Sequence, residues 1–169
     1  EEYVELSVLG FSEFEQSIPL LKLSNASAEE KKNILIVGNL HAREFFSSKF
    51  VLKFCNAFLF SLDSDKGIYP SARELLGKYN IYVIPVANPD GLKIAQEDWK
   101  EIESHKSSID SIKRIGPFSD WKANGKGIDL NNNFDDGNFE VKHGHLFEEK
   151  PASQGHKGAF PCQAIEAKI

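Results

Sequence analysis

Two apolar runs rich in β-branched residues, separated by a long helical stretch, constrain the fold of this chain most strongly. The first run is ILIVGNL at 34–40, and the second is NIYVIP at 80–85. Such runs are typical of buried strands, and the first has the pattern of a strand covered on both faces. Between them, residues 45–62 are apolar nearly all round and predict a buried helix, and 71–79 predict a shorter helix with Ser71 as its N-cap. Strand, helix, helix and strand in this order predict a parallel strand pair joined by a crossover.

The N-terminal segment predicts a β-hairpin that adds antiparallel strands to this sheet. YVELSVLGF at 3–11 and SIPLLKLSN at 17–25 are short alternating or apolar runs with a polar, acidic stretch between them. With 169 residues, of which 41% are hydrophobic, the chain is long enough to bury one core. We therefore expect an α/β fold with a mixed, mostly parallel sheet and helices on both faces. Residues 91–126 and the segment GKGIDLNNNFDDGNF predict irregular loops, and CQAIEAKI predicts the start of a last helix.

Composition and charge exclude several classes of partner. A net charge of −5 without a basic patch argues against binding to nucleic acid. We expect no membrane span, because no apolar run reaches the required length of about eighteen residues, and the fullest candidate, 45–62, is interrupted by Lys49 and Lys53. Two cysteines make no disulfide framework, so Cys55 is expected to be a buried free thiol that does not pair with Cys162. The compartment stays open between cytoplasmic and exported.

A histidine and a glutamate directly follow the first strand of the predicted crossover, in the sequence HARE. His41 and Glu44 are three positions apart, which places both side chains on one face of a turn. In an open α/β sheet, ligands bind beyond the carboxyl ends of the strands. Neutral imidazole and carboxylate are good Zn²⁺ ligands, and a catalytic zinc ion takes three protein ligands and an open water position. The spacing alone favours a second role, in which Glu44 stabilises the first helical turn and His41 caps the loop.

Segments in the same order along the chain resemble the zinc carboxypeptidases, the carboxypeptidase A-like family of metallopeptidases. GNLHAREF is similar to the G-x-H-A-R-E signature of that family, and SVLGFSEFEQSIPLLKLS resembles its opening hairpin. VIPVANPDG is similar to the P-x-x-N-P-D-G strand and turn. GKGIDLNNNF resembles G-V-D-L-N-R-N-F, and GAFPCQAIEAKI resembles the proline-containing segment that opens the next helix. The resemblance implies that residues 1–169 form the N-terminal half of a zinc carboxypeptidase-like catalytic domain, and therefore an incomplete domain.

The resemblance assigns a role to several single residues. It implies that His41 and Glu44 are the first two Zn²⁺ ligands and that Arg43 lies beside the substrate pocket, although a surface ion pair would suit Arg43 equally. Lys122 stands where the family has an arginine that polarises the scissile carbonyl, and a lysine offers positive charge there without the planar fork. A solvated loop lysine is the alternative for Lys122. Asn131 matches the asparagine that hydrogen-bonds the terminal carboxylate of the substrate.

Asn132 is where this sequence departs from the pattern of the digestive carboxypeptidases. The family has an arginine there that clamps the free C-terminus of the substrate, and losing a bidentate guanidinium removes the strongest element of that recognition. The stretch FSDWKANGKGIDLNNNF resembles instead the bacterial γ-D-glutamyl-(L)-diamino acid peptidases, which cut peptidoglycan stem peptides. The resemblance therefore implies a zinc-dependent hydrolase with a peptide substrate, and more narrowly a peptide of the bacterial cell wall.

The third zinc ligand of the family, a histidine on a later strand, and its general-base glutamate have no counterpart in this sequence. We therefore expect either a part of a longer enzyme or a degenerate, non-catalytic peptide-binding homologue. The histidines of HGH at 143–145 predict exposed loop residues, and His105 and His156 have no expected partner. NPDG at 88–91 predicts a turn with a mainly structural role.

Overall fold

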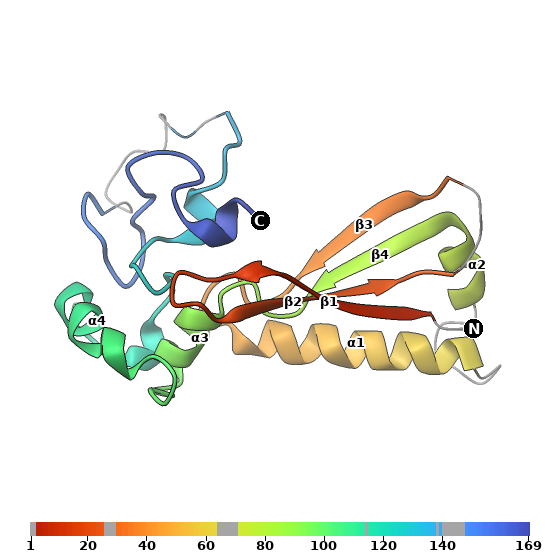
Figure 1. Ribbon diagram of the computed structural model, residues 1–169, viewed down its shortest axis with the longest axis horizontal. Coiled ribbons are helices and arrows are strands. Elements are labelled where there is room, and N and C mark those ends of the chain that lie inside the picture. Colours follow the sequence, from red (N-terminus) through yellow and green to blue (C-terminus); the bar gives the residue numbers. More distant parts are fainter. Residues whose placement is uncertain (1–2, 26–29, 64–70, 114, 138, 140–147) are drawn as a thin grey trace.

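The computed structural model describes residues 3–25, 30–63, 71–113, 115–137, 139 and 148–169 (Figure 1). Its strands are β1 (Val4–Phe11), β2 (Ser17–Leu23), β3 (Lys32–Val37) and β4 (Tyr79–Ile84). Its α-helices are α1 (Phe45–Asp63), α2 (Ala72–Lys78), α3 (Pro89–Ala95) and α4 (Lys106–Ile112). Short 3-10 turns are η1 (Glu103–His105), η2 (Phe118–Asp120), η3 (Leu130–Asn132) and η5 (Ile165–Ala167). The predicted hairpin, two further strands and two helices are therefore all present.

The strands form one mixed sheet in the order β1-β2-β4-β3. β1 pairs antiparallel with β2, and β2 pairs antiparallel with β4. β3 pairs in parallel with β4, with Ile34 opposite Ile81 and Val37 opposite Ile84. Because α1 and α2 connect β3 to β4, this pair is the predicted crossover unit. The carboxyl ends of β3 and β4 point toward a half of the molecule that is formed by loops and short helices (Figure 1).

The mixed α/β sheet is confirmed, but strand directions and face coverage differ from the prediction in the described part of the chain. Two of the three strand pairings there are antiparallel, because the N-terminal hairpin joins the sheet through β2, beside β4. The long helix α1 lies along one face, where it shares a core with α2 and the sheet (Figure 1). β3 is an edge strand, and its Leu35 and Val37 are 61% and 42% exposed. The predicted cover on both faces is therefore not met at β3.

Helix α1 has one buried face although its sequence is apolar nearly all round. Val51, Cys55 and Phe58 recur at helical spacing and lie buried against the sheet. The other face carries exposed aromatic side chains, including Phe46 at 72% and Phe50 at 64% exposure. The predicted burial of the whole helix is therefore wrong for this outer face, because a single sheet covers only one side of a helix.

By length and composition, α1 is also the one helix among the described residues that could cross a membrane. Its window Phe45–Leu62 has a mean hydropathy of 1.3 over 18 residues, so Lys49 and Lys53 interrupt the apolar run less than the sequence suggested. This is weak evidence for a span, because the core helix of a soluble protein passes the same test. The inner face of α1 packs on the sheet, and 28% of this window is buried.

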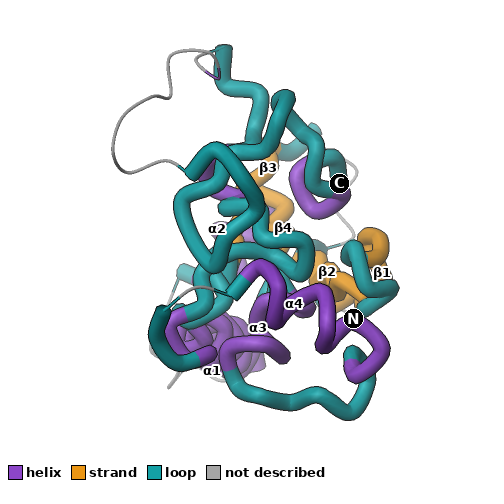
Figure 2. Tube along the Cα trace, turned by 90° about the vertical axis from the view of Figure 1, so that its left-hand side faces the viewer, coloured by secondary structure: helices purple, strands orange, loops and turns teal. Residues whose placement is uncertain are grey.

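A second core lies beyond the carboxyl ends of the parallel strands, among loops and short helices (Figure 2). Its buried members are Phe14, Ala42, Ile94, Ile102, Ile109, Trp121 and Ala123. α3 and α4 both contribute to it, so the stretch predicted as irregular contains two short helices. The predicted C-terminal helix is present only as the 3-10 turn η5. Because Ala42 and Trp121 are both members, this core holds the neighbours of His41 and Lys122 together.

The two cysteines lie in different parts of the fold. Cys55 is buried in α1 and Cys162 is half-buried in the C-terminal loop, and both are free thiols, as predicted. Burial raises the pKa of the Cys55 thiol above its ordinary value. Cys55 is therefore a core residue, with no feature of a reactive cysteine.

Candidate metal and substrate site

The loop that carries His41 begins where β3 ends, and close backbone contacts shape it. Gly38 N donates to Ile84 O of β4 at 2.8 Å, which extends the parallel ladder beyond β3. A Cβ at Gly38 would lie 2.7 Å from a backbone oxygen of the segment after β4, so this close approach requires glycine. Asn39 adopts the left-handed conformation at φ 49°, and its side-chain amide donates to the carbonyls of His41 and Ala42 at 3.1 Å. These contacts fix the backbone that carries the His41 imidazole.

The side chains of His41 and Glu44 face each other, as their spacing predicted. Nδ1 of His41 lies 3.0 Å from Oε1 of Glu44. The His41 side chain is 15% exposed, whereas that of Glu44 is 53% exposed. An imidazole nitrogen and a carboxylate oxygen thus meet at an edge of the site that solvent can reach, close enough to bind a common ion.

A buried carboxylate, Asp129, lies on the other side of the His41 ring. Its Oδ1 is 3.3 Å from His41 Nε2, and its side chain is 1% exposed. Neither of these two atoms has a hydrogen-bond partner among the described residues, so the contact between them is an ion-pair contact. Asp129 was not predicted from the sequence as a site residue, although it lies in the same GIDLNNNF segment as Asn131. The signal in the sequence that could have identified Asp129 was its position in that segment.

Hydrogen bonding and burial shift the titration of both groups. The neighbouring Asp129 carboxylate raises the pKa of the His41 imidazole above its ordinary value, against the opposing effect of burial. Burial acts to raise the pKa of the Asp129 carboxyl, but His41 and Lys122 beside it outweigh this effect and hold that pKa below its ordinary value. When the imidazole is neutral, an ionised Asp129 beside Nε2 favours the tautomer with hydrogen on Nε2, which leaves the lone pair of Nδ1 for a metal ion. That tautomer is the form that binds a metal ion.

Lys122 reaches the same buried carboxylate. Its Nζ lies 3.0 Å from Oδ2 of Asp129, and 23% of its side chain is exposed. Gly155 N donates to the same oxygen at 3.2 Å. Ala42 N donates to Lys122 O at 3.1 Å, which ties the loop of His41 to the segment of Lys122. The structure therefore brings Lys122 into the candidate site, where its ammonium contacts Asp129.

The predicted substrate-binding residues lie near these groups in the chain and differ in exposure. Arg43 is exposed, and its Nη1 donates to Asp120 O at 3.3 Å, close to Lys122 in the chain. Asn131 and Asn132 stand on η3 directly after Asp129, the first exposed and the second half-buried. Their contact with a substrate stays a prediction.

The NPDG turn clamps the two loops of the site together. Oδ1 of Asn88 accepts from Gly91 N at 3.0 Å and caps α3. Nδ2 of Asn88 donates to Leu40 O at 3.2 Å and to Ala123 O at 3.1 Å. Asp90 is fully buried, and it accepts hydrogen bonds from the turn after β1. The geometry thus agrees with the structural role predicted for this turn.

Zinc fits the donors of this site, although the described ligand set is partial. The imidazole of His41 and the carboxylate of Glu44 are donor types that zinc prefers, and metal-binding histidines generally carry an outer partner of the kind that Asp129 provides. In the described part of the chain, no group of three or more histidine, cysteine, aspartate and glutamate side chains could hold a metal ion. These residues would supply two of the three protein ligands that a catalytic zinc site requires.

The other described histidines have structural partners. The ring of His105 stacks on Phe14 with centroids 3.8 Å apart. His156 is buried, and its Nδ1 lies 2.8 Å from Glu148 O. Neither partner was predicted from the sequence. The histidines of the HGH sequence, 143–145, lie outside the described residues.

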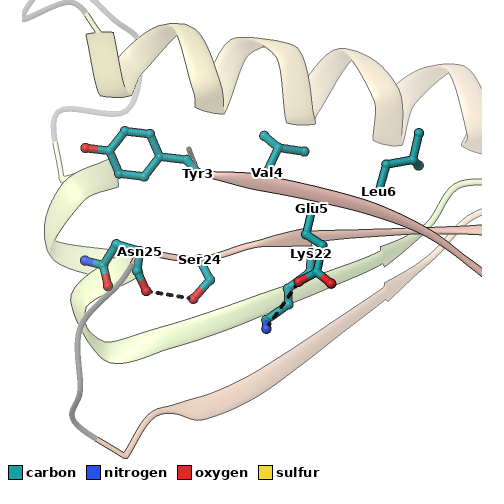
Figure 3. A pocket seen from close by; sticks show the side chains of 7 residues that line it. All are labelled: Tyr3, Val4, Glu5, Leu6, Lys22, Ser24 and Asn25. Carbon is teal, nitrogen blue, oxygen red and sulfur yellow. Dashed lines mark hydrogen bonds and ion pairs between the residues drawn. The ribbon is translucent and has the colours of Figure 1, made fainter. Parts of the chain in front are cut away.

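A hollow of about 550 Å³ lies away from this site, at the other end of the sheet (Figure 3). It is lined by Tyr3, Val4, Glu5, Leu6, Lys22, Ser24 and Asn25. Glu5 and Lys22 form an ion pair across it at 3.6 Å. None of the predicted site residues lines this hollow, so it does not compete with the His41 loop as the candidate site.

Comparison with known sequences identifies one family over the full chain. The zinc carboxypeptidase family matches residues 1–169. The γ-D-glutamyl-L-diamino acid endopeptidase 1 of Lysinibacillus sphaericus is 28% identical over 167 residues, which are 98% of this chain and 41% of that protein. An inactive metallocarboxypeptidase of Arthroderma otae is 28% identical over 159 residues, 90% of this chain and 24% of that protein. The chain therefore spans less than half the length of these curated relatives.

Comparison with solved structures supports the fold. The crystal structure of thrombin activatable fibrinolysis inhibitor superposes with a TM-score of 0.72. The match covers 98% of this chain and 37% of that chain, at 24% sequence identity. At this identity the likeness shows the fold, and it extends over almost all of the chain.

Proposed function

This chain belongs to the zinc carboxypeptidase family, and from that premise we propose that it is the N-terminal half of the catalytic domain of a zinc-dependent metallopeptidase. The observation that carries the proposal is the facing pair of His41 and Glu44, with Asp129 buried behind the imidazole. The family also contains inactive members, so membership alone does not imply catalysis. The facing pair supports zinc binding by this particular chain.

Zinc would supply Lewis acid chemistry at the scissile carbonyl and a water molecule of lowered pKa. The role of this chain would be to bind the ion through His41 Nδ1 and Glu44 and to hold the imidazole through Asp129. Lys122 carries positive charge into the site. A lysine ammonium has three donor hydrogens, so it can contact Asp129 and still offer one to the negative charge that develops on the carbonyl oxygen. The third ligand and the general base are proposed to come from a further part of the protein.

The proposed substrate is a peptide, and more narrowly a peptidoglycan stem peptide. Likeness to the Lysinibacillus endopeptidase over 98% of the chain supports this choice, because that protein is named for a γ-D-glutamyl-L-diamino acid bond. Asn132 supports it as well, since an amide stands where the carboxypeptidases have their carboxylate-clamping arginine. Asn131 and Asn132 would read the substrate by polar amide contacts, and exposed Arg43 could pair with a substrate carboxylate.

Zinc content and hydrolysis together test the proposed function in the full-length protein. Elemental analysis after dialysis is expected to give about one zinc ion per chain, as a site with three protein ligands requires. Hydrolysis of a muropeptide with a γ-D-glutamyl-diamino acid bond is expected in the same preparation. His41→Ala is expected to lose both, and His105→Ala is the matched control because His105 stacks on Phe14 outside the site. A protein that binds zinc but hydrolyses no peptide would contradict the proposed enzymatic function.

The second candidate is a non-catalytic, peptide-binding homologue of the same fold. Likeness to an inactive metallocarboxypeptidase favours it, and so does the partial ligand set of the described residues. Its expected result is muropeptide binding, measured by calorimetry, in a protein without zinc. Tightly held zinc contradicts this candidate.

Asn132 decides between the two classes of peptide substrate. The wild-type protein is expected to prefer the muropeptide to a dipeptide with a blocked N-terminus and a free C-terminus. Asn132→Arg is expected to raise kcat/KM for the dipeptide by roughly 10-fold to 100-fold, because a bidentate, charge-assisted pair with the terminal carboxylate becomes available. Asn132→Lys is the control, since it adds the charge without the fork. A wild-type preference for the simple dipeptide contradicts the role given to Asn132.

A further inference from the structure

Asp129 is a buried carboxylate at the centre of the candidate site. Its side chain is 1% exposed, and its backbone N donates to His156 O at 2.7 Å. An ionised carboxylate that leaves water needs a counter-charge and hydrogen-bond donors, since an unpaired buried charge is strongly destabilising. Lys122 provides the counter-charge at 3.0 Å.

The two oxygens of this carboxylate have separate partners. Oδ2 receives Nζ of Lys122 at 3.0 Å and Gly155 N at 3.2 Å. Oδ1 faces Nε2 of His41 at 3.3 Å, an ion-pair distance, and has no hydrogen-bond partner among the described residues. The contacts at Oδ2 therefore set the rotation of the carboxylate, and that rotation places Oδ1 against the imidazole.

Lys122 is itself held at both ends of its backbone. Its N donates to Ser153 O at 2.8 Å, in the same loop as Gly155. Its O accepts from Ala42 N at 3.1 Å, next to His41 in the chain. The ammonium of Lys122 thus lies between a fixed backbone and the buried carboxylate. It is therefore placed to hold that carboxylate in one orientation.

We propose that Lys122 is a positioning residue for the metal ligand His41 and acts through Asp129. By holding Oδ2 it keeps Oδ1 against Nε2, and the imidazole then presents Nδ1 to the metal ion in one tautomer and one orientation. The inference rests on the proposed zinc function. It differs from a role of Lys122 at the scissile carbonyl, because it predicts effects on metal affinity and on the imidazole ring without any substrate.

Two measurements without substrate test this role. The first is the zinc dissociation constant, from competition with a chromophoric chelator. The second is the tautomer of the neutral His41 ring in the metal-free protein, from nitrogen NMR at a pH high enough to deprotonate the ring. Lys122→Met is expected to weaken zinc binding about 10-fold to 100-fold and to turn a single tautomer with hydrogen on Nε2 into a mixture. Asp129→Asn is expected to weaken zinc binding to a similar degree. Adding Lys122→Met to Asp129→Asn should change little further, because the lysine acts through the carboxylate.

Matched variants keep the test decisive. Lys126→Met removes the charge of a nearby lysine that pairs with Glu13 at 2.5 Å, and it should leave both measurements unchanged. Lys122→Gln, which keeps a donor without the charge, serves if Lys122→Met does not fold. Unchanged zinc affinity and an unchanged tautomer in the Lys122 variants overturn the positioning role, and so do additive effects in the double variant. A wild-type protein that binds no zinc contradicts the proposed function instead, and the tautomer in the metal-free protein still decides the role of Lys122.

Discussion

Asn88 joins three segments of the chain through one fully buried amide side chain. Its oxygen caps α3, and its nitrogen donates to the carbonyls of Leu40 and Ala123. The packing around this amide is tight, since a Cβ at Gly91 would lie 2.4 Å from Ala123 O. Residue 91 must therefore be glycine, and the two loops of the candidate site depend on Asn88 for their spacing.

Asn88→Ala is expected to lower the free energy of unfolding by about 2–4 kcal/mol, because it removes a helix cap and leaves buried backbone groups without partners. Urea unfolding followed by circular dichroism measures the change. Asn88→Asp is the matched variant, since a carboxylate can still cap α3 but cannot donate to Leu40 or Ala123. A loss below about 0.5 kcal/mol in Asn88→Ala, the level of an ordinary surface substitution, would contradict the role of Asn88 in holding the two loops together.

Spacing in the sequence was enough to predict that His41 and Glu44 face each other, because both lie in one turn. The partners of that pair were harder to predict, since Asp129 and Lys122 are distant from it in the sequence. Their approach depends on the second core and on Asn88, which are tertiary features. A local pattern therefore predicted the facing pair, whereas the groups that contact it required the fold.

For helix α1, too, the sequence predicts the element itself, but the tertiary fold decides which of its faces is buried. Its length and composition predict a helix, and the helix is present at Phe45–Asp63. Because apolar residues occur nearly all round, periodicity gives no signal for the face that the sheet covers. The structure buries Phe58, which is 1% exposed, and leaves Phe50 at 64%.

Phe58→Ala is expected to destabilise the protein by about 3–5 kcal/mol, because it opens a cavity in the core between α1 and the sheet. Phe50→Ala, on the outer face of the same helix, is the matched control and is expected to cost less than about 1 kcal/mol. Thermal and urea unfolding of the two variants measure the difference. Equal losses would show that the outer face of α1 is covered in the protein.

The short helices were the elements least accessible from the sequence. α3 depends on the Asn88 cap, and α4 depends on the burial of Ile109 and on an ion pair of Lys106 with Asp110 at 2.5 Å. A helix of about seven residues has little stability of its own, so tertiary contacts decide whether it forms. Ser71 was predicted to cap α2, but its side chain makes no cap hydrogen bond there.

At the scale of the molecule, the order of the strands followed from contacts that no single segment encodes. The hairpin and the crossover were each predictable from local patterns. The choice of β4 as the partner of β2 was not, because it pairs Leu23 with Ile81 across the chain. That choice makes two of the three described pairings antiparallel and leaves β3 at an edge.

Glu166 lies on the C-terminal 3-10 turn η5. Its Oε2 accepts from Asn124 Nδ2 at 3.0 Å, and its Oε1 is buried without a hydrogen-bond partner among the described residues. Asp90 and Glu13 place further negative charge nearby. Burial, with a smaller contribution from these carboxyl groups, raises the pKa of Glu166 to about 7. The stability of the whole molecule should therefore depend on the protonation of this residue.

Glu166→Gln is expected to raise stability in mildly alkaline solution and to flatten its dependence on pH. In the wild-type protein the folded state keeps the Glu166 proton up to about pH 7, whereas the unfolded chain releases it near 4.5. Stability is therefore lost as pH rises through this window, by on the order of 2–3 kcal/mol above it. Glutamine still accepts from Asn124 but never becomes charged. Urea unfolding at about pH 5 and about pH 8 measures the slope, and Glu103→Gln at an exposed site controls for net charge. An unchanged slope in Glu166→Gln would show that another group governs the response.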